Sequence, residues 1–218
     1  MKSRTPRWTR RSSSLLALIV TGIMVAAGIA WAAATDNMVP TANYSPLCVD
    51  DTPDGPGGNC RTDNAQLSWY ADSTDGNPND DKLEMDDFYV VASVMGDEYE
   101  PTDLTVAYDS TPAFSGDSET DIVYQEWTVP GSADGVTWCN DAVGGFTCDQ
   151  QYIRIERGGY YTPGITCHET GHAVGLVHGN NASPALSQTA SALNCMKTPT
   201  SFGERLGTNN KENINNTY

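Results

Sequence analysis

The pattern of apolar and polar positions predicts strands in the middle of the chain and helices towards its end. Apolar and charged residues alternate over positions 152–156, as in a strand with one buried face. Positions 86–95 instead have the i, i+3, i+4, i+7 spacing of apolar residues that is typical of an amphipathic helix. Further strands are predicted where short β-rich runs lie between turn residues, at 66–71, 104–108, 122–129 and 136–139.

Two more helices are predicted in the last third of the chain. The strand region ends at a Pro-Gly pair, and residues 165–176 follow as a helix with Thr162 or Thr166 near its start. A terminal helix fits residues 208–216, with Thr208 as its N-cap. Because strands come first and helices later, we expect an α+β domain.

The N-terminal part of the chain has a different character. Residues 1–11 carry five basic groups and no acid, and the apolar run that follows ends on small residues with an A-x-A cleavage site. This order predicts a secretory signal over 1–34. The run is also long enough to span a bilayer, so an uncleaved N-terminal anchor is the alternative. Residues 35–63, rich in Pro, Gly, Asn and Asp, predict an extended arm with a short propeptide as the alternative, and 64–218 form the domain.

The charge of the chain excludes several classes of partner. The full chain has 12 basic and 28 acidic residues and a net charge of −16; without the five basic residues of the leader, 7 basic residues remain and the net charge is −21. Binding to nucleic acid needs a basic surface, so we expect no nucleic-acid partner. We expect no membrane partner unless the leader stays uncleaved, and a secreted monomer kept dispersed by its charge.

Six cysteines, all beyond the leader, fit an oxidising compartment and three disulfides. Sequence alone permits about 15 pairings. Local spacing favours two of them and leaves the third: Cys48–Cys60, Cys139–Cys148 and Cys167–Cys195.

All three histidines of the chain lie in the segment HETGHAVGLVH at positions 168–178. On a helix, His168 and His172 project from one face one turn apart, where two neutral imidazoles can bind the same Zn²⁺. Glu169 lies about 100° around the helix axis, where its carboxylate can flank a water molecule at the metal. The pattern therefore predicts two zinc ligands and a general base.

The third histidine requires a break in this helix. His178 lies six residues after His172, so on a continuing helix it would point about 120° away from the ligand face. Gly175 lies where the chain has to stop and turn back, and glycine adopts the left-handed conformation at little cost. Three protein ligands leave a fourth tetrahedral position open, which is typical of catalytic rather than structural zinc.

The motif HExxHxxGxxH resembles the zinc signature of the metzincin metallopeptidases. The resemblance covers about residues 64–218, and only the zinc motif is highly specific. It implies a mixed, twisted, mostly antiparallel-edged sheet with an active-site helix, a methionine turn beneath the zinc and a C-terminal helix. Met196, the only methionine after the motif, is the expected turn residue. The implied substrate-binding edge strand comprises Val136, Thr137, Trp138, Cys139 and Asn140.

Two departures from the family pattern refine this resemblance. Thr198 stands where astacins and serralysins carry a tyrosine, so the chain looks closer to the matrixins. Its ending, residues 206–218, resembles the closing helix of secreted bacterial relatives. Residues 46–50 faintly resemble the matrixin cysteine switch but lack its arginine and second proline. With Cys60 nearby, we expect a disulfide for Cys48 instead.

Together these features predict a secreted zinc-dependent endopeptidase, a hydrolase acting on proteins or peptides with Glu169 as general base. One alternative is a non-catalytic zinc-holding extracellular binding module, which would have no use for that carboxylate. The other is a hydrolase of a non-peptide amide, against which only the resemblance argues.

The sequence also suggests structural calcium as a second cofactor. An acidic loop supplies hard oxygen ligands suited to Ca²⁺, although it lacks the register of an EF-hand, and a solvated loop is the favoured interpretation. The oxygen-bearing residues of this loop are Asp75, Asn77, Asn79, Asp80 and Asp81.

Overall fold

The computed structural model describes residues 35–218 except 56–57, 73–81 and 117. The predicted leader and the candidate calcium residues lie outside this part of the chain, which belongs to a single compact unit spanning 32–218. Within the described residues, no helix has the length and apolar character needed to cross a membrane. Three disulfides are present, which is compatible with an extracellular protein.

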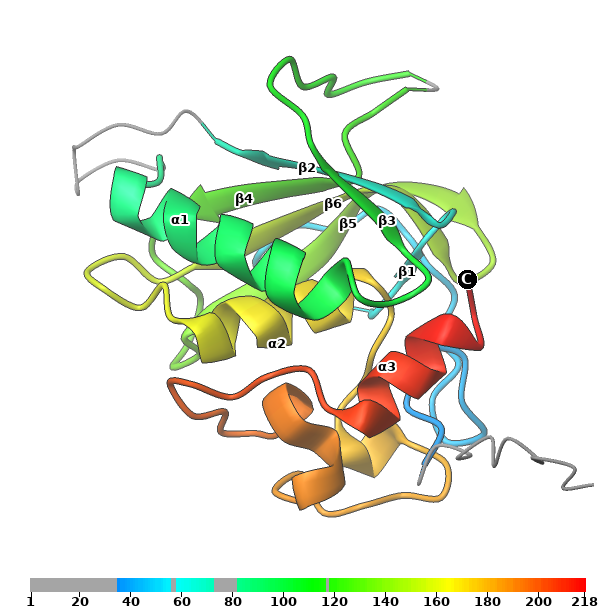
Figure 1. Ribbon diagram of the computed structural model, residues 1–218. Coiled ribbons are helices and arrows are strands. Elements are labelled where there is room, and N and C mark those ends of the chain that lie inside the picture. The colour runs from blue at the N-terminus through cyan, green and yellow to red at the C-terminus, as the bar shows by residue number, and fades with distance from the viewer. Residues whose placement is uncertain (1–34, 56–57, 73–81, 117) are drawn as a thin grey trace, which may run out of the picture. The chain divides into compact units, whose positions relative to one another are not determined.

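The fold is a mixed α/β arrangement built on one mostly parallel sheet (Figure 1). The strands follow the order β1-β6-β4-β2-β3, and β5 pairs with β6 alone. The five pairings in the described residues include a single antiparallel one, β5 with β6. The strands are β1 Arg61–Thr62, β2 Gln66–Ala71, β3 Thr105–Tyr108, β4 Ile122–Glu126, β5 Gly135–Gly144 and β6 Thr147–Ile155.

The expectation of a mostly antiparallel-edged sheet is therefore wrong. A short turn forces neighbouring strands to be antiparallel, and only the β5–β6 hairpin has one. Between β2 and β3 the chain instead passes through a helix, which carries it back to the same end of the sheet and makes the next strand parallel. The edge strand β3 is consequently parallel to its neighbour.

Two helices cover the same face of the sheet (Figure 1). Helix α1, Met85–Val94, begins one residue before its predicted start and continues beyond its predicted end as a π-helical segment, Met95–Tyr99. Helix α2, Pro163–Ala173, begins and ends earlier than predicted. It begins earlier because Pro163 is suited to the first helical position and Thr162 accepts a hydrogen bond from the Ile165 amide. It ends earlier because the chain turns at Gly175, whose φ is positive.

The C-terminal helix α3 is Thr208–Asn215. Its N-cap is Gly207, so the prediction that Thr208 caps this helix is wrong by one residue. Two short 3₁₀ segments, Gly179–Asn181 and Ser191–Met196, lie between α2 and α3.

The hydrophobic core lies between the sheet and the two helices on that face. Alternation along β6 buries Ile153 and Ile155 completely, as the sequence pattern predicts for a strand with one buried face. They belong to one cluster with Val91 of α1 and Cys167 of α2. The core thus fixes α2, which carries the histidine motif, against the sheet.

The arm before β1 packs onto the domain. Isolated antiparallel bridges join Asp36 to Ser183 and Met38 to Leu176. The buried Asn37 accepts hydrogen bonds from the side chains of Asn209 and Asn213 in α3, at 3.1 and 2.6 Å. The first part of the arm therefore ties the residues after α2 to the C-terminal helix.

Candidate metal centre

The three histidines of the motif converge on one point. The Nε2 atoms of His168, His172 and His178 are 3.0–3.1 Å apart in every pairing. His168 and His172 project from α2 and are buried, whereas His178 follows the helix and is partly exposed. Three ring nitrogens, from residues that lie up to ten positions apart in the chain, thus face a common centre.

Hydrogen bonds to backbone carbonyls set the tautomers of two of these rings. His168 Nδ1 lies 2.7 Å from the Cys195 carbonyl oxygen, and His172 Nδ1 lies 2.8 Å from that of Leu176. A carbonyl can only accept, so each Nδ1 carries the proton and each Nε2 presents a lone pair to the centre. Burial lowers the pKa of His168 to about 4 and also lowers the pKa of His172 well below its usual value, so both rings are neutral near pH 7.

This arrangement fits a zinc ion. Nitrogen ligands about 2.0–2.1 Å from one tetrahedral Zn²⁺ lie about 3.3–3.4 Å from one another, close to the separations found here. Lone pairs that face one another at such short range repel unless a cation lies between them. Outer hydrogen bonds from Nδ1 to carbonyls are also the usual support of zinc-binding histidines. The three rings therefore form a candidate site that could hold one divalent metal.

Gly175 makes the return of the chain to His178 possible. Its φ is +97°, its amide donates to the His172 carbonyl at 3.0 Å, and the Leu176 amide donates to the Gly171 carbonyl at 2.7 Å. This pair of hydrogen bonds is the Schellman arrangement that ends helices. The same turn places the Leu176 carbonyl next to His172 Nδ1, so the helix end also orients a candidate metal ligand.

Replacing Gly175 by alanine should destabilise the protein by at least about 1–2 kcal/mol, the cost of a left-handed conformation for a residue with a Cβ. The new Cβ would also lie 2.6 Å from Arg61 Cβ. Because the turn carries His178, zinc affinity should fall as well. Denaturant unfolding and zinc titration measure the two effects. Gly96→Ala is the matched control, since its Cβ would meet only Glu100 Oε2 at 3.9 Å; equal stability of both variants would contradict the prediction.

Glu169 lies beside the histidines in a tight setting. Its side chain is 4% exposed, and the Thr137 hydroxyl donates to its Oε2 at 2.8 Å. Burial raises the pKa of Glu169 to about 7, against the opposing effect of the Thr137 hydrogen bond. Gly135 leaves room for this carboxylate, because a Cβ there would lie 2.7 Å from Glu169 Cγ and Oε1. A buried carboxylate held near a metal site is a candidate proton acceptor.

A cleft of about 360 Å³ opens over the histidines and Glu169. One wall is the start of β5, including Val136 and Thr137. The opposite wall is formed by residues 197–200, which include Thr198. The remaining predicted edge-strand residues do not line the cleft: Trp138 stacks on Tyr152, Cys139 is in a disulfide, and Asn140 donates to the Gln150 side chain.

Met196 lies directly beneath α2. A Cβ on Gly171 would lie 2.3 Å from Met196 Sδ, so only glycine at this position lets the methionine approach the helix between the two ligands. The Cys167–Cys195 disulfide joins the start of the motif to the residue before Met196. The segment that contains Met196 thus supports the candidate metal ligands in two ways, through the disulfide and through the Cys195 carbonyl next to His168 Nδ1.

The other two disulfides also follow the pairs that local spacing favours. Cys48 is joined to Cys60, and Cys139 to Cys148. In this state the Cys48 thiol is not available as a zinc ligand. The four half-cystines form a small buried cluster of their own, next to the β5–β6 hairpin.

Several residues that contact α2 could not be identified from any pattern in the sequence. The Tyr99 hydroxyl donates to the Cys167 carbonyl at 2.6 Å, and the Tyr124 hydroxyl lies 2.7 Å from Thr170 Oγ1. Both tyrosines are fully buried and come from elements far from the motif in the chain. Only the folded structure brings them to α2, and no spacing rule would have selected them.

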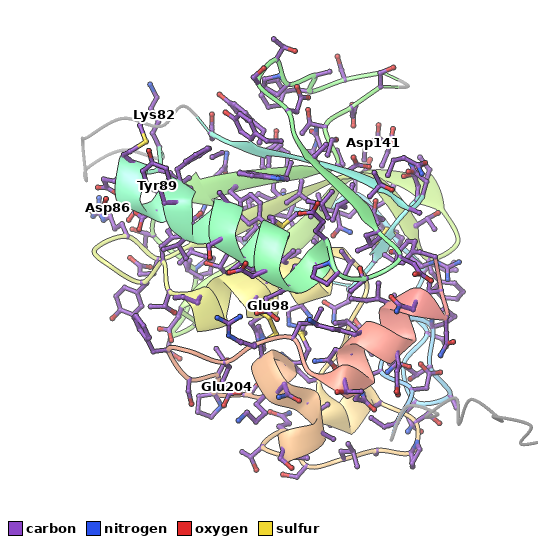
Figure 2. The ribbon with its side chains drawn as sticks, viewed as in Figure 1. Lys82, Asp86, Tyr89, Glu98, Asp141 and Glu204 are labelled. Carbon is purple, nitrogen blue, oxygen red and sulfur yellow. A yellow bond between two sulfur atoms is a disulfide. The ribbon has the colours of Figure 1, made fainter. Side chains whose placement is uncertain are left out.

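Two acidic groups outside the cleft also bring three carboxylates together. Their oxygen atoms lie within 4.8 Å of one another in each group. In the first, burial raises the pKa of Glu126 to about 8 and that of Asp87 to about 7, so protons stabilise this group near neutrality. The groups are Glu84, Asp87 and Glu126, and Glu119, Asp141 and Asp149, of which Asp141 is labelled in Figure 2.

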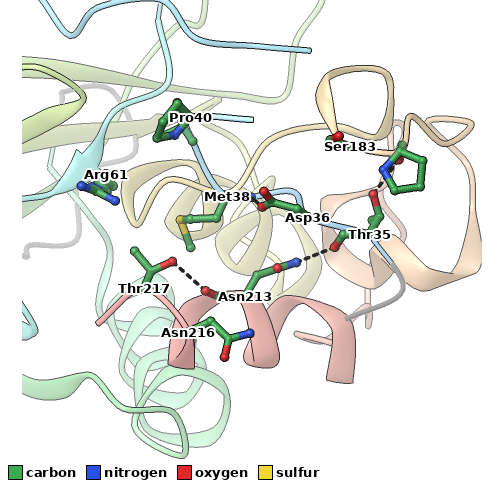
Figure 3. Close-up of a pocket in the computed structure, with 11 residues that line it drawn as sticks. Thr35, Asp36, Met38, Pro40, Arg61, Ser183, Asn213, Asn216 and Thr217 are labelled. Atoms are coloured by element: carbon green, nitrogen blue, oxygen red, sulfur yellow. Dashed lines mark hydrogen bonds between the residues drawn. The ribbon is translucent and has the colours of Figure 1, made fainter. Parts of the chain in front are cut away.

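A larger hollow of about 510 Å³ lies beside Thr35 (Figure 3). The Asn213 side chain donates to the Thr35 carbonyl at 2.8 Å, and the Thr35 hydroxyl donates to the Pro184 carbonyl at 2.6 Å. The charged residues of its described lining are Asp36 and Arg61, which do not form a set of metal ligands. The histidine cleft is therefore the better candidate for the functional site.

Comparison with other proteins adds nothing to this assignment: no protein-family model matches the chain, and no curated protein matches it.

Proposed function

We propose that this protein is an exported zinc-dependent endopeptidase of the metzincin type. The observation that carries the proposal is the convergence of three imidazole Nε2 atoms, 3.0–3.1 Å apart, beside the buried carboxylate of Glu169. A purely structural zinc site is normally closed by four protein ligands and needs no adjacent base. The disulfides and the signal-like leader support export.

Each residue of the site has its own role in the proposed reaction. Zn²⁺, when bound by the three histidines, supplies a Lewis acid that lowers the pKa of water towards about 7 and polarises a carbonyl group. Glu169 takes a proton from the attacking water and passes it to the leaving amine. The Thr137 hydroxyl orients the carboxylate through its hydrogen bond to Oε2. Burial keeps competing water away from this transfer.

The substrate is an extended peptide lying along the start of β5. In the described residues β5 pairs only with β6, so its other edge offers free main-chain groups next to the cleft. Strand addition binds a peptide through its backbone and depends little on its sequence. The Cys167–Cys195 disulfide and Met196 form the floor of the site, in the position of a metzincin methionine turn.

Zinc content and proteolysis of the purified protein test the proposal. We expect one zinc ion per chain, cleavage of casein or gelatin, loss of cleavage after chelation, and recovery when zinc is restored. Cleavage that survives complete zinc removal would contradict a zinc mechanism. Zinc binding without cleavage of any protein or peptide would instead favour the non-catalytic zinc-holding module.

A further inference from the structure

The arm contacts the same strand that we propose for substrate binding. The Asp51 amide donates to the Cys139 carbonyl at 2.8 Å, and the Ala142 amide donates to Asp50 Oδ1 at 2.7 Å. Both contacts are made on β5, beyond the part that lines the cleft. The arm therefore occupies the edge of β5 from Cys139 onwards.

Covalent and backbone contacts hold this part of the arm in place. The Cys48–Cys60 disulfide packs against the Cys139–Cys148 disulfide in one buried cluster. On the hairpin turn, the Cys48 amide donates to the Gly145 carbonyl at 2.8 Å and the Arg61 amide donates to the Phe146 carbonyl at 2.9 Å. The arm is thus fixed to the β5–β6 hairpin on both sides of Asp50 and Asp51.

The directions of the backbone N–H and C=O groups of β5 show how much of its edge remains free to pair with a peptide. The Asp134 carbonyl accepts from the Glu156 amide of the chain following β6, whereas the Cys139 carbonyl points away to the arm. Backbone groups alternate along a strand, and no register shift occurs between Gly135 and Cys139. The outward groups are therefore those of Gly135, Thr137 and Cys139, and the Cys139 carbonyl is already taken.

The scissile bond has to lie close to Gly135 and Thr137. The Thr137 hydroxyl contacts Glu169 at 2.8 Å, and Gly135 lies against the same carboxylate. A peptide antiparallel to β5, the more stable pairing, runs towards the zinc site from the side of Cys139. At about 3.3 Å per residue, its residues before the scissile bond meet the arm after only two or three positions.

We infer that residues 48–51 end the substrate-binding edge of β5 at Cys139, so that the protein recognises only about three residues before the scissile bond. This inference rests on the proposed peptidase function and deepens it by naming a limit of the substrate. Residues further upstream leave the strand and extend into solvent. Asn59 of the same arm lines the cleft, so the arm borders the site as well as the strand.

A series of N-acetylated peptides tests this limit. The peptides share one cleavage sequence and carry one to six residues before the scissile bond, and mass spectrometry checks that the same bond is cut in each. For the wild-type protein with zinc, kcat/KM should rise about two- to tenfold with each added main-chain pairing up to the third residue. It should then stay constant within about twofold.

Freeing the arm should extend the rise in kcat/KM to the fourth and fifth residues. Cys48→Ala/Cys60→Ala removes the covalent anchor. Asp50→Ala/Asp51→Pro removes both hydrogen bonds but keeps the disulfide, and serves if the cysteine variant does not fold. Asp54→Ala, an exposed change in the same arm, should keep the wild-type plateau.

The outcomes separate the two proposals. A wild-type kcat/KM that keeps rising past the third residue would overturn the limit while leaving the peptidase function intact. The same holds if a folded arm variant keeps the wild-type plateau. If the zinc-loaded wild-type protein cleaves no peptide at any length, the proposed function fails, and the inference fails with it.

Discussion

Glu169→Gln should lower peptide cleavage by roughly 10²–10⁴-fold, the usual contribution of a positioned general base, while the protein retains one zinc ion per chain. The amide has nearly the shape of the carboxylate and its oxygen can still accept from the Thr137 hydroxyl, so the fold of the cleft should persist. It cannot take a proton from water, however. Zinc analysis and kcat/KM on one peptide measure the two properties separately.

The matched control is Glu100→Gln, the same chemical change at an exposed position of the turn after the π-helical segment. It should leave both cleavage and zinc content at wild-type values. If Glu169→Gln cleaves as fast as this control, Glu169 is not the general base. If it loses zinc together with activity, the effect is structural, and the loss of cleavage says nothing about proton transfer.

The second large effect is expected from removing the Cys167–Cys195 disulfide. The Cys167→Ala/Cys195→Ala variant should lose roughly 3–4 kcal/mol of unfolding free energy, because the bond closes a loop with a sequence separation of 28. Both half-cystines are completely buried between α2 and the turn that contains Met196. Since the Cys195 carbonyl orients His168, the variant should also bind zinc more weakly.

Denaturant unfolding with chelator present, followed by zinc titration, tests both parts of this prediction. Cys48→Ala/Cys60→Ala is the comparison, because it removes a disulfide of sequence separation 12 that lies in a different buried cluster from Cys167–Cys195. It should lose stability but keep its zinc affinity. If Cys167→Ala/Cys195→Ala lowers the free energy of unfolding by less than about 1 kcal/mol, the prediction is contradicted, because the disulfide then restricts the unfolded chain very little.

The local sequence determined most of what can be said about the candidate metal ligands. His168, His172 and Gly175 act through one helix turn and its end, and these depend on spacing alone. The strand over 66–71 and the helices near 86 and 208 were found at almost their observed bounds for the same reason, since apolar periodicity and turn residues are local properties. The disulfide pairs followed from short separations and from elimination.

The direction of the strands could not be obtained in this way. Whether neighbouring strands are parallel depends on the path of the chain between them, and the helix between β2 and β3 decided it. The resemblance led to an antiparallel-edged sheet because it was carried by one motif and said little about the rest of the domain. The capping residue of α3 was also misplaced, by one position, because Gly207 and Thr208 both suit a helix start.

The sequence by itself thus determined which reactive groups the chain carries: three imidazoles, one carboxylate, a helix break and six cysteines in an acidic chain. Only the tertiary structure decided which residues hold these groups in place and where the arm covers β5. Thr137 and Gly135 reach Glu169 across more than thirty positions of sequence, and the arm reaches β5 across about ninety. Such contacts depend on how the sheet, the helices and the arm pack together. Packing between distant segments produces no periodic pattern in the sequence, so the sequence alone could not predict these contacts.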